Sequence, residues 1–435
     1  MNCNLQKNIA EIFHQNAALS SLVEDIERAN QPFWLVGGCL RDLLLDRVIT
    51  DIDIGSTEDP TQLARTWAAK VHGRWFWLDA DRFQSRVLLN SKIHVDFSPL
   101  RAETIIEDLE LRDFTINSFA LLIDSELSHG ELLDPLKGQV DLQKKLLRVC
   151  SSQSFTDDPL RMLKGIRHAV TLGFDCAAST LTLMSKFSSL LSSVAGERIK
   201  DEFLKILSSE CPVQGLELLV ETGLLKELFG SPGDNWNHSR AFDQLNDLQM
   251  KLAQINRTIE ISMSEDSMPD SLSNTTLFLL VNLLQQYSPD KLPELLHKTL
   301  RFSRSEQHLV EQLISKGAEV EETFSLQEVA QSKRAKALAV ELLEPYSLEK
   351  MLYWGVCQNK FTYQQALYRH QAFVAEQKIG RVPDLLNGQE VAEIINLPYG
   401  PHIGLWQHRL KNAEIKGDFA TKQGASKWLK KQITV

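Results

Sequence analysis

Two glycines that are followed closely by two aspartates constrain the start of this chain more than any other feature. Residues 33–36 form a short apolar run that ends at Gly37 and Gly38, and after a helix-like stretch Asp51 and Asp53 alternate with isoleucines. This order predicts a strand, a glycine turn, a short helix and a second strand from which both carboxylates project on one face. Glycines let a phosphate approach the backbone, a helix N-terminus favours an anion, and paired carboxylates suit Mg²⁺. Each element alone would be an ordinary turn or a solvated strand edge, but together they predict metal-assisted nucleotidyl transfer.

The order Gly-Gly-x-x-Arg-Asp-x-x-Leu followed by Asp-x-Asp resembles the signature of the DNA polymerase beta superfamily. The likeness is greatest to the branch that contains class II tRNA nucleotidyltransferases (CCA-adding enzymes) and bacterial poly(A) polymerases. The resemblance implies a template-independent transfer in which Asp51 and Asp53 are the catalytic carboxylates and hold two Mg²⁺ ions. It also implies that Gly37, Gly38 and Arg41 bind a nucleoside triphosphate, with CTP and ATP as substrates.

A third acid, Asp96, lies in residues 93–97, a run with the composition of a strand. In the resemblance an acidic strand residue stands just before a turn like Pro99-Leu100-Arg101, which makes Asp96 a candidate third catalytic carboxylate. The alternative is an edge-strand acid that points to water.

A second motif begins at Leu111 and resembles Arg-Arg-Asp-Phe-Thr-x-Asn, with leucine in place of the first arginine. The forked guanidinium of Arg112 suits a triphosphate. The side chains of Asp113 and Asn117 suit the hydroxyl groups of a ribose. The departure at Leu111 removes one contact to phosphate or primer that the resemblance would imply. The alternative reading is that Asp113 caps a helix over residues 115–121.

Basic side chains recur every three residues after Asp158-Pro159, at Arg161, Lys164 and Arg167, which places them along one flank of a helix. The segment resembles the family's base-reading motif Glu-Asp-x-x-Arg. A carboxylate that accepts from an exocyclic amine, beside an arginine that donates to a ring nitrogen, would accept cytosine and adenine. Uracil and guanine would leave buried polar groups unpaired. The alternative is that Asp158 only caps the helix and Arg161 is a surface residue.

A further segment, Glu197-Arg198-x-x-x-Glu202, resembles the family's fifth motif. Here Glu197 and Arg198 would brace the base-reading helix. Solvated helical charges are the alternative reading.

Only ten residues separate Arg101 from Arg112, where similar enzymes usually have a longer flexible loop. In the resemblance that loop assists the switch from CTP to ATP, and a short loop goes with enzymes that add only two cytidines. The sequence therefore leaves open full CCA addition and CC addition alone, the latter with a complementary A-adding enzyme as a partner. The short loop disfavours a poly(A) polymerase. A non-catalytic RNA-binding scaffold is the reading from a different class, which the intact Asp51 and Asp53 disfavour.

The fold class changes along the chain. Short β-type runs alternate with helical patterns up to about residue 149, and almost all later patterns are helical. We therefore expect an α/β nucleotidyltransferase head, with a small mixed sheet and flanking helices, followed by all-α neck, body and tail domains. The expected bounds are 1–149 for the catalytic head, 150–229 for the neck that recognises the base, 230–375 for the body and 376–435 for the tail.

The formal net charge of −10 does not by itself indicate a nucleic-acid-binding protein. An RNA substrate therefore requires basic residues that are gathered on one surface. The C-terminal stretch meets this requirement with Lys411, Lys416, Lys427, Lys430 and Lys431. It also resembles the family's tRNA-elbow-binding end. We expect the partner to be tRNA, bound at its 3′ end and its elbow.

No apolar run reaches membrane-spanning length, and the N-terminus lacks the apolar region of a signal peptide. The six cysteines include no Cys-x-x-Cys pair. We therefore expect a cytoplasmic protein without a disulfide framework or a membrane partner.

Overall fold

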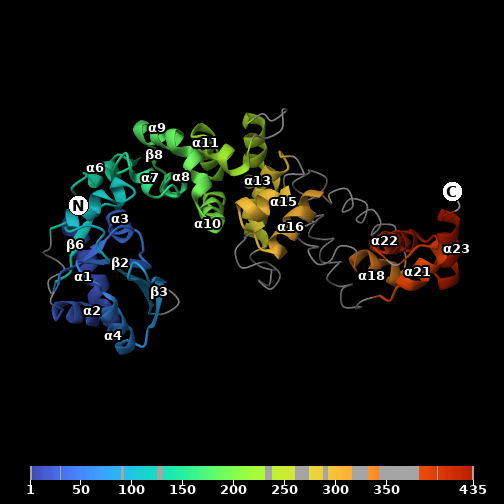
Figure 1. Ribbon diagram of the computed structural model, residues 1–435, viewed down its shortest axis with the longest axis horizontal. Coiled ribbons are helices and arrows are strands. Elements are labelled where there is room, and N and C mark those ends of the chain that lie inside the picture. Colours follow the sequence, from blue (N-terminus) through green and yellow to red (C-terminus); the bar gives the residue numbers. More distant parts are fainter. Residues whose placement is uncertain are drawn as a thin grey trace. The chain divides into compact units, whose positions relative to one another are not determined.

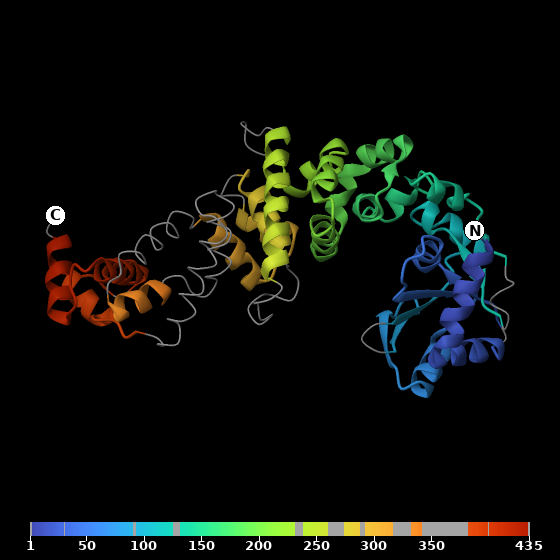
Figure 2. The ribbon, with the colours of Figure 1, turned by 180° about the vertical axis from the view of Figure 1, so that it is seen from behind.

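The computed structural model describes residues 2–29, 31–89, 93–124, 131–230, 238–259, 274–287, 292–315, 332–341, 382–398 and 400–433. The chain forms two compact units, Met1–Gly230 and Ser231–Val435, which are treated separately below (Figures 1 and 2). None of the described helices is long and apolar enough to cross a membrane.

Six strands form one mixed sheet in the N-terminal unit, in the order β3-β4-β5-β2-β1-β6. Strands β2 and β5 run parallel, and the other neighbouring pairs are antiparallel. The strands are β1 (Phe33–Val36), β2 (Asp51–Ser56), β3 (Arg74–Asp79), β4 (Gln84–Leu88), β5 (His94–Pro99) and β6 (Ala120–Leu122). The expected mixed sheet is confirmed.

Strand β6 lies where a helix over residues 115–121 was one reading. The structure has only a 3₁₀ turn at Thr115–Asn117, after which the chain pairs with β1. Phe119, Ala120 and Leu121 are fully buried. An extended segment at the sheet edge buries this apolar run more completely than a helix with one solvent-facing side would.

Helices cover one face of this sheet and leave the other for the site. Trp67 of α4 packs edge-on against Phe97 of β5, with ring centroids 5.9 Å apart. The covering helices are α1 (Asn2–Gln15), α2 (Ala17–Glu27) and α4 (Thr61–Lys70), which lie beside the sheet in Figure 1. Because successive strand residues face opposite sides, buried Ile52 and Ile54 point toward these helices and Asp51 and Asp53 point away.

Helix α8 (Arg161–Leu172) follows Asp158-Pro159 and ends at Gly173, whose φ of 67° is the left-handed conformation expected at a helix C-terminus. A Cβ at Gly165 would lie 2.6 Å from Met184 Cε and 2.7 Å from Phe114 Cζ, so this glycine lets α8 pack directly against the segment that carries the second motif. The other helices of the N-terminal unit are α3 (Gly38–Leu44), α5 (Ile105–Glu110), α6 (Gly138–Gln143), α7 (Ser154–Asp157), α9 (Ala178–Phe187), α10 (Gly196–Leu207), α11 (Pro212–Glu221) and α12 (Leu224–Phe229).

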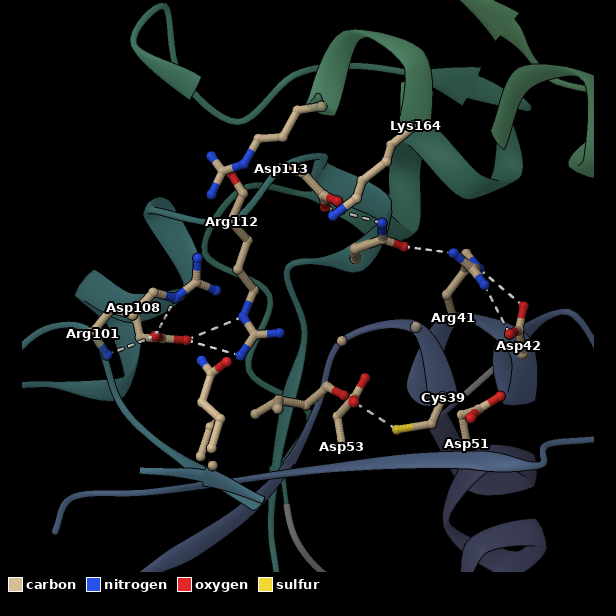
Figure 3. A pocket seen from close by; sticks show the side chains of 18 of the residues that line it. Cys39, Arg41, Asp42, Asp51, Asp53, Arg101, Asp108, Arg112, Asp113 and Lys164 are labelled. Atoms are coloured by element: carbon tan, nitrogen blue, oxygen red, sulfur yellow. Dashed lines mark hydrogen bonds and ion pairs between the residues drawn. The ribbon is translucent and has the colours of Figure 1, made fainter. Parts of the chain in front are cut away.

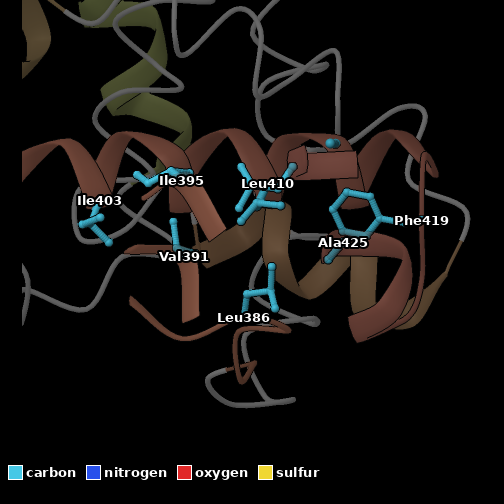
Figure 4. Packing of buried hydrophobic residues seen from close by; sticks show 9 residues of the cluster. Leu386, Val391, Ile395, Ile403, Leu410, Phe419 and Ala425 are labelled. Carbon is cyan, nitrogen blue, oxygen red and sulfur yellow. The ribbon is translucent and has the colours of Figure 1, made fainter. Parts of the chain in front are cut away.

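The described part of the second unit is helical, as expected. Its helices include α13 (His238–Ile259), α14 (Asn274–Leu284), α15 (Leu292–Glu294), α16 (Arg304–Ser315), α18 (Lys333–Glu341), α21 (Gly388–Ile395), α22 (Pro401–Lys416) and α23 (Lys422–Ile433). Helices α21, α22 and α23 share a small core that includes Val391, Leu410 and Phe419 (Figure 4). Much of the predicted body, including residues 342–381, lies outside the described residues.

Candidate active site

A cavity of about 600 Å³ brings together residues from the sheet, the second motif and α8. Asp96, the candidate third catalytic carboxylate, is not among the residues that line it. The cavity is lined by every residue that the sequence assigned to nucleotide or metal binding: Gly37, Gly38, Arg41, Asp51, Asp53, Arg112, Asp113, Asn117, Asp158, Arg161, Lys164 and Arg167. These residues span more than a hundred positions in the sequence, so their convergence is a result of the fold.

Gly37 makes the turn at the floor of this cavity. Its φ of +80° favours glycine, and a Cβ there would lie 3.0 Å from Arg112 Nη1 and 3.2 Å from Asp53 Oδ2. A Cβ at Gly38 would meet only ordinary contacts. Gly37 therefore lets Arg112 and Asp53 approach the turn closely.

Asp51 and Asp53 differ in environment although they share a strand face. Asp51 is exposed and contacts His94, with 3.1 Å between Oδ1 and Nδ1. Burial, together with the negative charges of Asp96 and Asp51, raises the pKa of Asp53 to about 6. The negative charge of ionised Asp53 is therefore not fully balanced by neighbouring positive charges, and a divalent cation would balance it. Two carboxylates beside a space for phosphates suit Mg²⁺, which completes its shell from water and substrate oxygens.

Asp96 lies beside Asp53 but has a different partner. Arg86 of β4 donates from Nε to Oδ1 at 2.7 Å and from Nη2 to Oδ2 at 2.8 Å. Among the described residues, no group of three or more acidic, histidine or cysteine side chains is arranged to hold a metal ion. These contacts do not support the expected role of Asp96 as a third catalytic carboxylate, since its two oxygens are bound to a guanidinium.

Arg112 is oriented by a residue that sequence reasoning missed. The carboxylate of Asp108, 2% exposed, accepts from Arg112 Nη2 at 2.9 Å and from the backbone N–H of Arg101 at 3.0 Å (Figure 3). Burial opposes ionisation of Asp108, but Arg112 and Arg101 hold its pKa below the usual value. An acid four residues before an arginine in a helical pattern was the available signal.

A chain of hydrogen bonds links the first motif to the second. Arg41 donates to both carboxylate oxygens of Asp42 and to Asn117 Oδ1 at 2.8 Å, and Asn117 Nδ2 donates to Asp113 Oδ1 at 3.1 Å. Burial raises the pKa of Asp113, but His168, Asn117 and Lys164 together hold it below its usual value. Asn117 and Asp113 are thus held in place at the cavity wall, and Asp113 is ionised.

The predicted base-reading pair is held by contacts within the protein. Asp158 Oδ2 accepts from Arg198 at 3.2 Å, which agrees with the bracing role predicted for Arg198, while Glu197 is exposed. Arg161 is 8% exposed and donates to the backbone carbonyls of Leu111 at 3.1 Å and of Arg112 and Ser154 at 3.4 Å. Arg161 is therefore not the surface residue of the alternative reading, and its guanidinium joins α8 to the second motif.

The other basic residues of α8 differ in their partners. Arg167 donates from Nε to Glu202 of α10 at 2.7 Å, a contact that the sequence did not predict. Lys164 reaches over Asp113 (Figure 3). Burial lowers the pKa of His168 well below its usual value, and the nearby charges of Arg167 and Arg41 act in the same direction, whereas Asp113 acts against them.

Leu111, where the resemblance would place an arginine, is 42% exposed. It lines a second cavity of about 560 Å³, together with the cationic side chains of Arg82, Arg101 and Arg198. Arginines therefore lie around this part of the second motif, although position 111 itself carries no charge.

The basic residues of the tail fall into two groups. Lys416, Lys427, Lys430 and Lys431 are exposed on α22 and α23. Lys411 contacts Glu341 of α18 at 2.9 Å and Asp384 at 3.2 Å and is only 19% exposed. These contacts favour a structural role for Lys411 over the predicted RNA contact.

Comparisons with known proteins agree with this arrangement. Residues 33–148 match the model of the poly A polymerase head domain, and residues 173–233 match that of the probable RNA and SrmB-binding site of polymerase A. The chain is 31% identical to a CC-adding tRNA nucleotidyltransferase from Geobacter sulfurreducens, over 96% of each chain. It resembles a CCA-adding enzyme solved with CTP (TM-score 0.64, 19% identity, 96% of each chain) and a Thermotoga maritima CCA-adding enzyme solved with tRNA (TM-score 0.62, 20% identity, 95% of each chain).

Proposed function

Because this chain belongs to the class II tRNA nucleotidyltransferases, which add nucleotides to the 3′ end of tRNA, we propose that it adds the two cytidines of the CCA end and not the final adenosine. A complementary A-adding enzyme would then complete the end. The relative from Geobacter sulfurreducens, similar over nearly its whole length, is described as CC-adding and supports this reading.

The observation that carries the proposal is the short connection between Arg101 and Arg112. It is folded rather than open: Thr104 begins α5 with a reciprocal capping box, in which it accepts from Glu107 N at 3.3 Å and donates its own N–H to Glu107 at 3.0 Å. Asp108 then ties the segment to Arg101, and Leu109 is fully buried. A segment fixed in this way has no free length with which to reshape the nucleotide site for ATP.

The reaction that we propose uses Asp51 and Asp53 as ligands of Mg²⁺. When bound there, the metal would promote attack by the 3′-hydroxyl of the tRNA and neutralise the leaving pyrophosphate. Arg112, oriented by Asp108, would bind the triphosphate at the Gly37 turn. Asn117 and Asp113 would hydrogen-bond the ribose and favour a ribonucleotide.

Base choice would depend on Asp158 and Arg161. Asp158 can accept from the exocyclic amine of cytosine, with its position maintained by Arg198. Arg161 would fix the distance between α8 and the second motif, so that a larger purine is excluded by the width of the site. Both residues line the cavity, which supports this assignment.

The exposed lysines of α22 and α23 would bind the phosphate backbone at the tRNA elbow. The reaction would take place in the cytoplasm.

Product length tests the proposal directly. The full-length protein is incubated with Mg²⁺ and three tRNA transcripts, which end at the discriminator base, at C and at CC. CTP and ATP are supplied separately and together, and products are resolved to single nucleotides. Asp53→Asn is the control that shows whether an activity belongs to this site.

We expect two cytidines on the bare transcript, one on the C-ended transcript, and no adenosine on the CC-ended transcript. Addition of CCA would refute the CC-only assignment while retaining the family's reaction. A ladder of adenosines would refute the tRNA-end assignment, and a product that Asp53→Asn also forms would refute the role of this site.

A further inference from the structure

The register of the sheet places Asp53, Asp96 and Arg86 in one row. Asp53 of β2 lies opposite Asp96 of β5, and Asp96 lies opposite Arg86 of β4. Paired residues on neighbouring strands project from the same face, so all three side chains are on the face that carries the cavity. The guanidinium of Arg86 therefore lies two strands away from Asp53, a proposed metal ligand.

Arg86 binds Asp96 with the full fork of its guanidinium. The two hydrogen bonds, of 2.7 and 2.8 Å, use both carboxylate oxygens, and the two side chains are 29% and 23% exposed. Lone pairs remain on those oxygens, but a metal ion placed there would lie close to the guanidinium. Because like charges repel strongly where water is partly excluded, Asp96 is a poor metal ligand while Arg86 holds it.

The lining of the cavity also separates Asp51 and Asp53 from Asp96. Asp51 and Asp53 are among the residues that line it, whereas Asp96 and Arg86 are absent from that set. A triphosphate and its metal ion in the cavity would thus contact the carboxylates of Asp51 and Asp53 directly. Asp96 would act on the metal only through its position beside Asp53.

We propose that Arg86 is a positioning residue that keeps Asp96 out of the coordination shell, so that Asp51 and Asp53 alone hold the divalent cation. This inference rests on the metal-dependent reaction proposed above. It concerns metal affinity, however, which the length of the product does not report. The arrangement keeps the cation weakly held by protein, so that triphosphate oxygens supply much of its shell.

Metal affinity without nucleotide tests the proposal. Mn²⁺ is titrated into the full-length protein at about pH 7.5, where Asp53 is ionised, and free Mn²⁺ is followed by electron paramagnetic resonance. The variants are Arg86→Leu, Asp96→Asn/Arg86→Leu and Arg86→Lys. Arg65→Leu is the matched control, since Arg65 lies over the rings of Trp75 and Trp77 and carries the same charge.

We expect Arg86→Leu to lower the Mn²⁺ dissociation constant about tenfold, because Asp96 is released beside Asp53. The double variant removes the ion pair without a change in net charge and should bind Mn²⁺ within about threefold of the parent. Arg86→Lys, which keeps the charge but not the fork, should fall between the parent and Arg86→Leu. Arg65→Leu should match the parent. The Mg²⁺ concentration for half-maximal transfer should follow the same order.

Two results would overturn the proposal. If the double variant binds Mn²⁺ tenfold more weakly than the parent, Asp96 is a ligand. If Arg86→Leu binds Mn²⁺ no more tightly than Arg65→Leu does, Arg86 does not keep Asp96 from coordinating the metal. Thermal melting of each variant shows whether it is folded, and Arg86→Gln replaces Arg86→Leu if the latter is not.

Discussion

Replacing Asp108 by Asn should lower the stability of the N-terminal unit and also weaken the binding of nucleotide in the candidate site. Asp108 is 2% exposed and compensates Arg112, whose side chain is 14% exposed. Breaking one side of a buried ion pair costs about 3 kcal/mol, the lower end of the usual range, chosen because Arg101 is more open to water. For a unit the size of Met1–Gly230, this corresponds to a fall in melting temperature of roughly 6–12 °C.

The same substitution should weaken nucleotide binding. Without the carboxylate, Arg112 loses its fixed orientation, and ordering one such side chain costs about 1.4 kcal/mol, which raises the KM for CTP about tenfold. Melting curves of the full-length protein and initial rates on a bare tRNA transcript measure the two effects. Glu107→Gln, one residue earlier and exposed, is the matched control, because the capping box accepts either residue.

The pH dependence supplies a further check. Because the pKa of Asp108 is lowered in the fold, its stabilising contribution is complete above the ordinary value of 3.8 and is lost as the pH falls through the lower, folded-state value. The gap between parent and variant should therefore be constant from neutral pH to about pH 4 and narrow only below it. Equal melting temperatures and equal KM values for parent and Asp108→Asn at neutral pH would refute the reasoning.

Three other predictions follow from the site and the tail. Because the pKa of Asp53 is raised to about 6, its protonation should weaken Mn²⁺ binding by about tenfold per pH unit as the pH falls below that value. The same shift should make the metal-free fold more stable as the pH falls from about 7 to 4. Calorimetry at several pH values measures both effects. Arg161→Ala should relax the choice of base, seen as AMP incorporation, more than it weakens tRNA binding; unchanged selectivity would remove Arg161 from base choice. Lys427→Glu should weaken tRNA binding and reduce its salt dependence without a change in melting, whereas Lys411→Met should destabilise the tail, so equal effects of the two would contradict the division of the lysines.

The local elements of the head were predictable because their signals are local. The glycine turn and the alternation of acid and isoleucine in β2 each depend on a few consecutive residues. Strand β6 was not predicted, because its pairing with β1 decides between helix and strand for a short apolar run.

The sequence by itself identified the candidate site residues: two carboxylates on one strand face, the arginine of the second motif, and the basic flank of α8. Only the tertiary structure decided what those residues contact. Asp96 meets Arg86 because of the strand register, and Lys411 meets two acids from distant segments. Patterns of polarity and backbone preference act over a few residues. The pairing of charges instead depends on which strands and helices lie side by side, and that is set by burial of the whole chain.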